Sequence, residues 1–252
     1  MINKRFKIIA SLAIVFSLNI EGAFASSYDN TDRLEKIIRN NLKQWEEEFE
    51  IPYYSSDIIN VIKESVDDDQ YLRRSIKSIA VRQKGKKILV DITYRTSKEE
   101  EEYIDTVLEP VVKNIAGENM SDYEKVKAIN KYICDEFQYD TTLEKDNTYE
   151  GLTTGFTTCN GYAMTASKMF SMAGLENKIV LGTLDGISHG WNEVKIDGKW
   201  YNIDVTNNDY TSSDKYFLKS DDSFKREGFV WNDDKTYEPC NEDYINLAVL
   251  IE

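Results

Sequence analysis

Three residues of this sequence have the side chains that cysteine-nucleophile chemistry requires: Cys159, His189 and Asp204. In such chemistry a thiolate attacks a carbonyl carbon, an imidazole takes the thiol proton, and a carboxylate holds the imidazole in one tautomer. His189 is the only histidine in the chain, and Cys159 is one of three cysteines. The three residues are far apart in sequence, so the elements around them decide whether they can meet.

Cys159 precedes a segment with the hydrophobic spacing of a buried helix. The helix is expected to begin near Gly161 and to end at Gly174, with apolar residues along one face: Ala163, Ala166, Met169, Phe170 and Ala173. At a helix N-terminus, N–H groups and the helix dipole lower the pKa of a thiol and can stabilise an oxyanion. A buried structural cysteine explains this segment, taken alone, equally well.

His189 and Asp204 lie on two expected strands, 189–196 and 199–206, which are joined by the hairpin signal Asp197-Gly198. A two-residue turn pairs the residues on either side of it, and this register places His189 and Asp204 diagonally on one face. Diagonal neighbours lie about 7–8 Å apart at the backbone, which an imidazole and a carboxylate can bridge. The alternative role for Asp204 is to form a turn at the strand end.

The segments before the nucleophile predict mixed helix and strand. Hydrophobic spacing predicts helices over 31–50 and 56–66, a hairpin of 75–82 with 87–94, and a helix that begins near Ser97. Ser121 and Glu124 have the spacing of a capping box, which should open a helix to about Phe137. A loop over 138–156 is expected to follow, and loops of this kind often carry functional residues.

The first 25 residues have the three parts of a secretory signal peptide: basic residues, an apolar run over 8–20, and the cleavage pattern Ala23-Phe24-Ala25. The run is shorter than the roughly 20 residues that span a bilayer, although a retained anchor is the alternative. We therefore expect a secreted or cell-surface protein with no stable membrane span after cleavage. The net charge of −14 disfavours nucleic acid as a partner.

The other cysteines and the acidic residues give no sign of a metal or cofactor. Cys134 and Cys240 could form a disulfide, or Cys134 could be a small apolar residue buried in a helix. A single histidine cannot provide a typical zinc site, and the acidic run Asp67–Asp69 lacks the spacing of a calcium loop. We predict neither a metal site nor a cofactor.

Three motifs in this order resemble those of the transglutaminase-like superfamily of thiol enzymes: Cys159–Ala163, His189–Asn192, and Trp200-Tyr201-Asn202-Ile203-Asp204. The resemblance covers roughly residues 120–240. It implies an α+β fold with a papain/transglutaminase-like core, in which the nucleophile helix packs on an antiparallel sheet. The expected organisation is a signal peptide over 1–25, an N-terminal α/β region of unknown role over 26–116, and a catalytic domain over 117–252.

The resemblance also implies an activity on amide bonds of protein or peptide substrates, some of them attached to a cell wall or surface. Cys159, His189 and Asp204 would form an acyl-thioester on Cys159, and Tyr149 would be the second oxyanion donor. Release of the acyl group to water gives a cysteine protease or amidase, which we favour. Release to a lysine amine gives a cross-linking transglutaminase, and a non-catalytic binding module is the further alternative.

Overall fold

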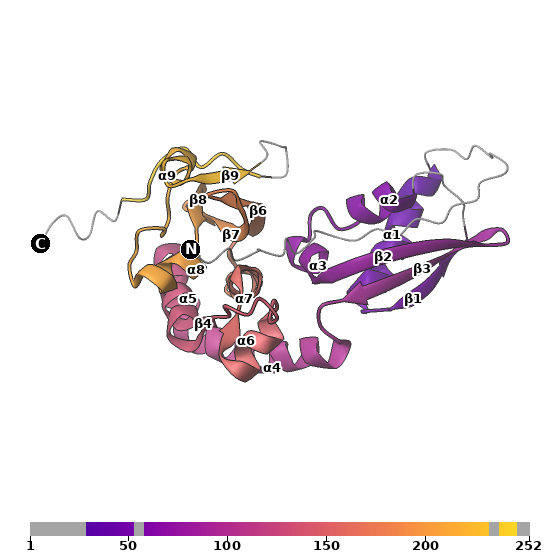
Figure 1. Cartoon of the computed structure of the whole chain (residues 1–252), viewed down its shortest axis with the longest axis horizontal. Coiled ribbons are helices and arrows are strands. Elements are labelled where there is room, and N and C mark those ends of the chain that lie inside the picture. Colours follow the sequence, from indigo (N-terminus) through magenta and orange to yellow (C-terminus); the bar gives the residue numbers. More distant parts are fainter. Residues whose placement is uncertain (1–28, 53–57, 232–236, 246–252) are drawn as a thin grey trace, which may run out of the picture. The chain divides into compact units, whose positions relative to one another are not determined.

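The computed structural model describes residues 29–52, 58–231 and 237–245, and it divides the chain into two compact units (Figure 1). The first unit ends at Ser97 and the second begins at Lys98. The expected signal peptide over 1–25 lies outside the described residues. No described helix is long and apolar enough to cross a membrane.

Unit 1 packs short helices against a three-stranded antiparallel sheet of order β1-β3-β2. Its elements are α1 (Asp29–Lys43), β1 (Glu48–Ile51), α2 (Ile58–Glu64), α3 (Gln70–Ser75), β2 (Ile76–Lys84) and β3 (Lys87–Tyr94). Ile38, Ile62 and Val90 are among the fully buried residues of its core. The predicted hairpin is confirmed, since Lys84 pairs with Lys87 across the turn.

The helix predicted over 31–50 is wrong at its C-terminal end. Trp45 has a φ of 57°, in the left-handed region, and this conformation stops α1 at Lys43. The chain then extends, and the alternation of buried Phe49 and Ile51 with exposed glutamates forms β1.

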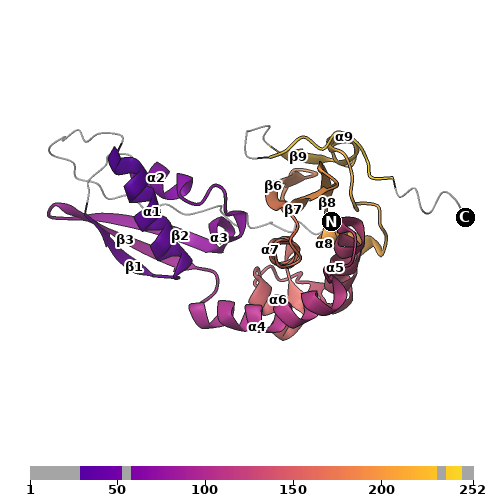
Figure 2. The same cartoon turned by 180° about the vertical axis from the view of Figure 1, so that it is seen from behind.

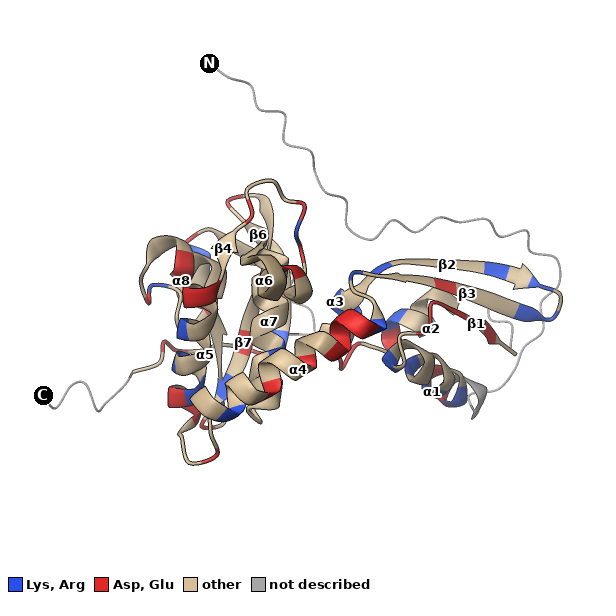
Figure 3. Cartoon of the chain, turned by 90° about the horizontal axis from the view of Figure 1, so that it is seen from below, with Lys and Arg blue, Asp and Glu red and all other residues tan. Residues whose placement is uncertain are grey.

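Unit 2 is built around a buried helix, α7 (Cys159–Met172). Three further helices pack beneath it: α4 (Lys98–Ile115), α5 (Asp122–Glu136) and α6 (Thr148–Thr154) (Figure 2). The predicted capping box at Ser121 and Glu124 is present at the start of α5. Acidic residues gather in the first turn of α4 (Figure 3). Their negative charges interact favourably with the positive end of the helix dipole.

The sequence placed the boundary between the two regions at residues 116 and 117, but the structure divides the chain before α4. The apolar stripe of α4, with Ile104, Leu108 and Val112, is buried in the same core as Phe170 of α7. A helix whose apolar face is buried in one core moves with that core. Helix α4 therefore belongs to unit 2.

The other side of α7 packs on a four-stranded antiparallel sheet of order β8-β7-β6-β9. Its strands are β6 (Asn177–Leu184), β7 (Ile187–Ile196), β8 (Lys199–Ile203) and β9 (Phe229–Trp231). Two short helices, α8 (Val205–Thr211) and α9 (Asp221–Arg226), and the parallel pair β4 (Gln138–Tyr139) and β5 (Phe156–Thr157) complete the unit. The structure is thus of the α+β class that the sequence predicted.

The two faces of this sheet have different partners. On the inner face, Val194 and Ile196 are buried in the α7 core, and Asn192 Nδ2 donates to Ala163 O at 2.9 Å. On the outer face, Trp191 and Phe229 pack with Phe224 of α9. The alternation of strand residues fixes which side chain lies on which face.

Two predicted segments differ from the structure. The strand predicted over 199–206 ends at Ile203, because Asp204 caps α8 instead of continuing β8. The loop predicted over 138–156 contains α6 and the β4–β5 pair, because Asn147 caps α6 through a bond from Glu150 N at 2.9 Å. Side-chain capping starts both helices in polar segments that lack hydrophobic periodicity.

Gly161 lets the first turn of α7 approach β5, so we predict that Gly161→Ala destabilises unit 2. A Cβ there would collide with the Thr157 side chain and lie 2.9 Å from Asn147 O. Overpacking costs about 1–3 kcal/mol, which exceeds the gain of about 1 kcal/mol in helix propensity. Urea unfolding followed by tryptophan fluorescence measures the loss.

Gly117→Ala is the matched control, because its Cβ would lie at an ordinary 3.7 Å from Lys113 O. Its free energy of unfolding should stay within about 0.5 kcal/mol of the parent chain. Equal stability of the two variants would show that the approach at Gly161 is not tight.

Candidate active site

Cys159 is the first residue of α7, two residues earlier than the predicted start of the helix. Thr158 occupies the N-cap without a side-chain bond to the helix, and its own N–H donates to Lys145 O at 2.8 Å. The Thr158 side chain therefore does not cap the first-turn N–H groups of α7, and the half-buried Cys159 lies at this helix start. This is the helix N-terminus that the sequence predicted for the nucleophile.

The thiol lies at the edge of β7, beyond the end of β8. The last β8 residue, Ile203, pairs with Asn192, and Gly190 is two residues farther along β7. The N–H of Gly190 donates to the Cys159 sulfur. If β8 had continued past Ile203, one of its carbonyl groups would have accepted the Gly190 N–H. The Cys159 sulfur accepts it instead.

His189 connects the thiol to Asp204. Its Nε2 lies 2.7 Å from Asp204 Oδ2, and the ring also hydrogen bonds to Cys159. Because Nε2 faces the carboxylate, Nδ1 is the nitrogen that faces the thiol. The imidazole stacks on Trp191 and meets Phe229 edge-on, with centroid distances of 6.2 and 5.8 Å.

Asp204 has two structural roles, which the sequence had offered as alternatives. Its Oδ2 contacts His189, and Asn207 Nδ2 donates to the same oxygen at 2.5 Å. Its Oδ1 accepts the Asn207 N–H at 3.1 Å, which caps α8. The carboxylate is fully buried, so these donors replace the water that an ionised group loses on burial. Asn207 is a positioning residue that the sequence analysis missed.

The predicted hairpin register is confirmed. Ile196 pairs with Lys199 across the turn, and the pairing continues without a shift to Asn192 and Ile203. His189 and Asp204 are therefore diagonal neighbours on the outer face. Trp191 Nε1 donates to Asn202 Oδ1 at 2.9 Å in the same diagonal relation, one step along the strands.

The charges of this site favour a thiolate beside an imidazolium. Burial opposes ionisation of Cys159, but the hydrogen bond and positive charge of His189 and the Gly190 N–H lower its pKa below the ordinary thiol value. Burial likewise opposes protonation of His189, yet Asp204 and Cys159 raise its pKa to about 10. Because the two groups titrate together, the thiolate and the imidazolium are both present at pH values between the lowered pKa of Cys159 and the raised pKa of His189.

Tyr139, which the sequence did not indicate, lies near Cys159, whereas the ring contact of the predicted Tyr149 is with α4. Tyr139 is on β4, next to Thr157 of β5, and it is 38% exposed. Burial of its hydroxyl and the charges of Cys159 and Asp140 raise its pKa to about 12, so it stays a hydrogen-bond donor. The ring of Tyr149 instead packs edge-to-face on Tyr103 of α4. No sequence pattern indicates the pairing of β4 with β5 that brings Tyr139 to this position.

The remaining cysteines do not form the disulfide considered from the sequence. Cys134 is half-buried in α5 and Cys240 is buried, and both are free thiols. Burial raises the pKa of the Cys134 thiol to about 12. Burial is also the main cause of the raised pKa of the Cys240 thiol. Both thiols therefore differ from Cys159 in the direction of the shift. Within the described ranges, His, Cys, Asp and Glu form no group of three that could hold a metal ion.

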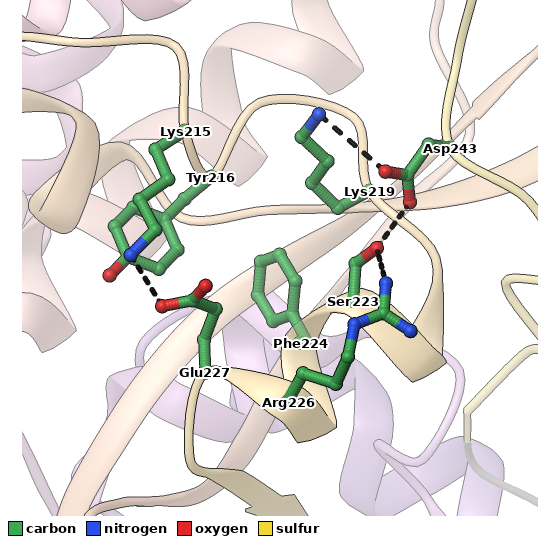
Figure 4. Close-up of a pocket in the computed structure, with 8 residues that line it drawn as sticks. All are labelled: Lys215, Tyr216, Lys219, Ser223, Phe224, Arg226, Glu227 and Asp243. Carbon is green, nitrogen blue, oxygen red and sulfur yellow. Dashed lines mark hydrogen bonds and ion pairs between the residues drawn. The ribbon is translucent and has the colours of Figure 1, made fainter.

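A pocket of about 210 Å³ lies elsewhere in unit 2 (Figure 4). Its charged groups are paired with one another: Lys215 with Glu227 at 2.5 Å, and Lys219 with Asp243 at 3.6 Å. Ser223 Oγ donates to Asp243 and accepts from Arg226. Cys159, His189 and Asp204 are not among the residues that line this pocket, so it is separate from the cluster at the end of β8.

Comparison with known proteins places the site within a family match. Residues 109–205 match the model of the Transglutaminase-like superfamily. The matched range includes Cys159, His189 and Asp204. The chain is also 28% identical over 117 residues to the kyphoscoliosis peptidase of Homo sapiens. That match covers 39% of this chain but only 18% of the relative.

Solved structures show more distant likenesses. A crystal structure of a TGase has a TM-score of 0.40 and 17% identity, covering 63% of this chain and 50% of that chain. The periplasmic domain of TgpA from Pseudomonas aeruginosa, bound to ethylmercury, has a TM-score of 0.35 and 13% identity, with coverages of 48% and 55%. Both TM-scores are below 0.5.

We predict that iodoacetamide alkylates Cys159 at pH 6 much faster than Cys134 or Cys240, because its pKa is lowered. An ordinary thiol with a pKa of about 8.5 is less than about 1% thiolate at that pH. The rate at Cys159 should fall only as the pH drops through its lowered pKa. In His189→Ala the rate at pH 6 should fall by about 10-fold or more. Mass spectrometry of the three cysteine peptides gives the rates, and three equally slow thiols would contradict the prediction.

Asp204→Asn should separate the two roles of this residue. Asparagine is as good an N-cap as aspartate, so α8 and the melting temperature should be nearly unchanged. The charge that raises the pKa of His189 is lost, so alkylation of Cys159 at pH 6 should slow by about 10-fold. Asp204→Ala should also lose about 0.5–2 kcal/mol of stability through the cap. Equal stability of the two variants in thermal unfolding would argue against the capping role.

Proposed function

We propose that the chain is a thiol enzyme that cleaves amide bonds of protein or peptide substrates, a proposal supported by the match of residues 109–205 to the model of the Transglutaminase-like superfamily. The proposal includes export from the cell, for which the N-terminal sequence pattern is the support. The chain spans less than a fifth of the curated relatives that it matches, with 18% covered. The support for its activity therefore comes from its own residues.

One observation carries the proposal: Cys159, His189 and Asp204 form a continuous hydrogen-bonded series at the start of α7. A structural cysteine has no need of a lowered pKa, and the two other thiols have raised ones. A thiolate held by an imidazolium attacks carbonyls at neutral pH without a separate activation step.

In the proposed reaction, the Cys159 sulfur attacks the amide carbonyl and a carbon–sulfur bond forms. The carbonyl oxygen becomes an oxyanion. Its donors in this proposal are the Cys159 N–H and the hydroxyl of Tyr139, whose pKa is raised in part by the charge of Cys159. His189 Nδ1 gives its proton to the nitrogen of the leaving amine, and the carbon–nitrogen bond breaks. The product is an acyl-thioester on Cys159.

The acyl group then passes to a second nucleophile. His189, now neutral, takes a proton from water, and the resulting hydroxide releases a carboxylic acid. We favour this hydrolytic route, and the name of the related human peptidase agrees with it. Transfer to a lysine amine uses the same thioester and is the alternative. The two routes differ only in which nucleophile reaches the thioester.

We predict that the chain without residues 1–25 turns over a glutamine-containing peptide and that Cys159→Ala abolishes the reaction. Peptide fragments would indicate a protease, ammonia without fragments an amidase, and incorporation of an added primary amine a transglutaminase. Turnover should decrease above about pH 10, where His189 loses the proton that the leaving amine needs. Mass spectrometry distinguishes the products. An unreacted peptide together with an inert Cys159 would support a non-catalytic binding module.

A further inference from the structure

The inner face of the sheet continues beyond the point where α7 covers it. Helix α7 packs on this face over Asn192 and Val194 and begins at Cys159, beside Gly190. Two rows of paired residues lie farther along the strands. One row holds Leu181 and Gly190, and the next holds Val230, Thr183 and Ser188. Residues that pair directly across strands share a face.

Two large apolar side chains of these rows are exposed. Leu181 is 37% exposed and Val230 is 63% exposed. Leu181 and Val230 are diagonal neighbours on adjacent strands, so they form a contiguous apolar surface, and contiguous exposed apolar surfaces mark interaction sites. We call Leu181, Gly190, Thr183, Ser188 and Val230 the inner-face strip.

The strip is continuous with the nucleophile. The N–H of Gly190 contacts the Cys159 sulfur, and the Leu181 side chain lies 3.6 Å from the position that a Gly190 Cβ would occupy. Because Gly190 has no side chain, a substrate backbone can lie close to the strand at this point. A side chain adjacent to the reacting amide would then meet Leu181.

We infer that the inner-face strip binds the substrate and selects polypeptides with a bulky aliphatic or aromatic side chain next to the reacting amide. This inference depends on the proposed function of Cys159. A substrate polypeptide fits this strip because the strip carries exposed apolar side chains and is continuous with the thiol. A hydrophobic contact of this kind discriminates by about 10- to 200-fold for each methylene-sized difference, which a rate comparison can measure.

The experiment compares two alkylating reagents on the otherwise unchanged chain: N-iodoacetyl-leucine amide and N-iodoacetyl-serine amide. In each, the Cys159 thiolate displaces iodide and a sulfur–carbon bond forms, so no amide turnover is required. The leucine reagent should alkylate Cys159 about 10-fold faster than the serine reagent. Leu181→Ser and Val230→Ser should each reduce this preference several-fold, while the rate with plain iodoacetamide stays unchanged.

Ile187→Ser is the matched control. Ile187 is on the same β6–β7 hairpin and is 62% exposed, but its pairing with Leu184 places it on the outer face. The leucine preference should persist in this variant. Loss of the preference here, with retention in the Leu181 and Val230 variants, would overturn the inference.

The reaction with plain iodoacetamide distinguishes failure of the strip from failure of the proposed function of Cys159. A Cys159 that reacts with it but shows equal rates with the leucine and serine reagents overturns the inference about the strip alone. A Cys159 that is inert to all three reagents overturns the proposed function and the inference with it.

Discussion

The site depends on the burial of one carboxylate. Asp204 has no exposed surface, and an ionised group without water is tolerated only when charges and donors surround it. His189 Nε2 and two groups of Asn207 meet this need, and each comes from a fixed place in the fold. His189 requires the β7–β8 register, and Asn207 requires that α8 begin immediately after Asp204. A shift in either element would leave the carboxylate buried without partners.

The end of β8 also explains how residues from two faces of one sheet can meet. Cys159 belongs to the helix on the inner face, whereas His189 and Asp204 lie on the outer face with Trp191. Side chains on opposite faces of a complete sheet are separated by the backbone. Where β8 stops, the edge of β7 opens, and the thiol reaches both the imidazole and the Gly190 N–H around that edge.

The sequence predicted the features that local rules determine. The Asp197-Gly198 turn fixed the register, and the Ser121–Glu124 spacing fixed the start of α5. It could not predict contacts that depend on packing between distant segments. Tyr139 is close to Cys159 because β4 pairs in parallel with β5, and nothing in either two-residue strand indicates that pairing. The extent of β8 was misjudged because Asp204 suits a strand register and a helix cap equally.

Helix α8 is only seven residues long, and Asp204 is its N-cap. Isolated helices of this length are marginal, so their formation depends on capping and on tertiary contacts. The tertiary contacts of α8 are with the core helices: Val205 is buried in the α7 core, and Asn208 Nδ2 donates to Asn130 Oδ1 of α5 at 3.0 Å. Opening of α8 would therefore expose part of that core and, in the same event, remove Asn207 from the carboxylate. The orientation of His189 is thus tied to the cooperative folding of unit 2, and on heating thiol reactivity would be lost together with the native core.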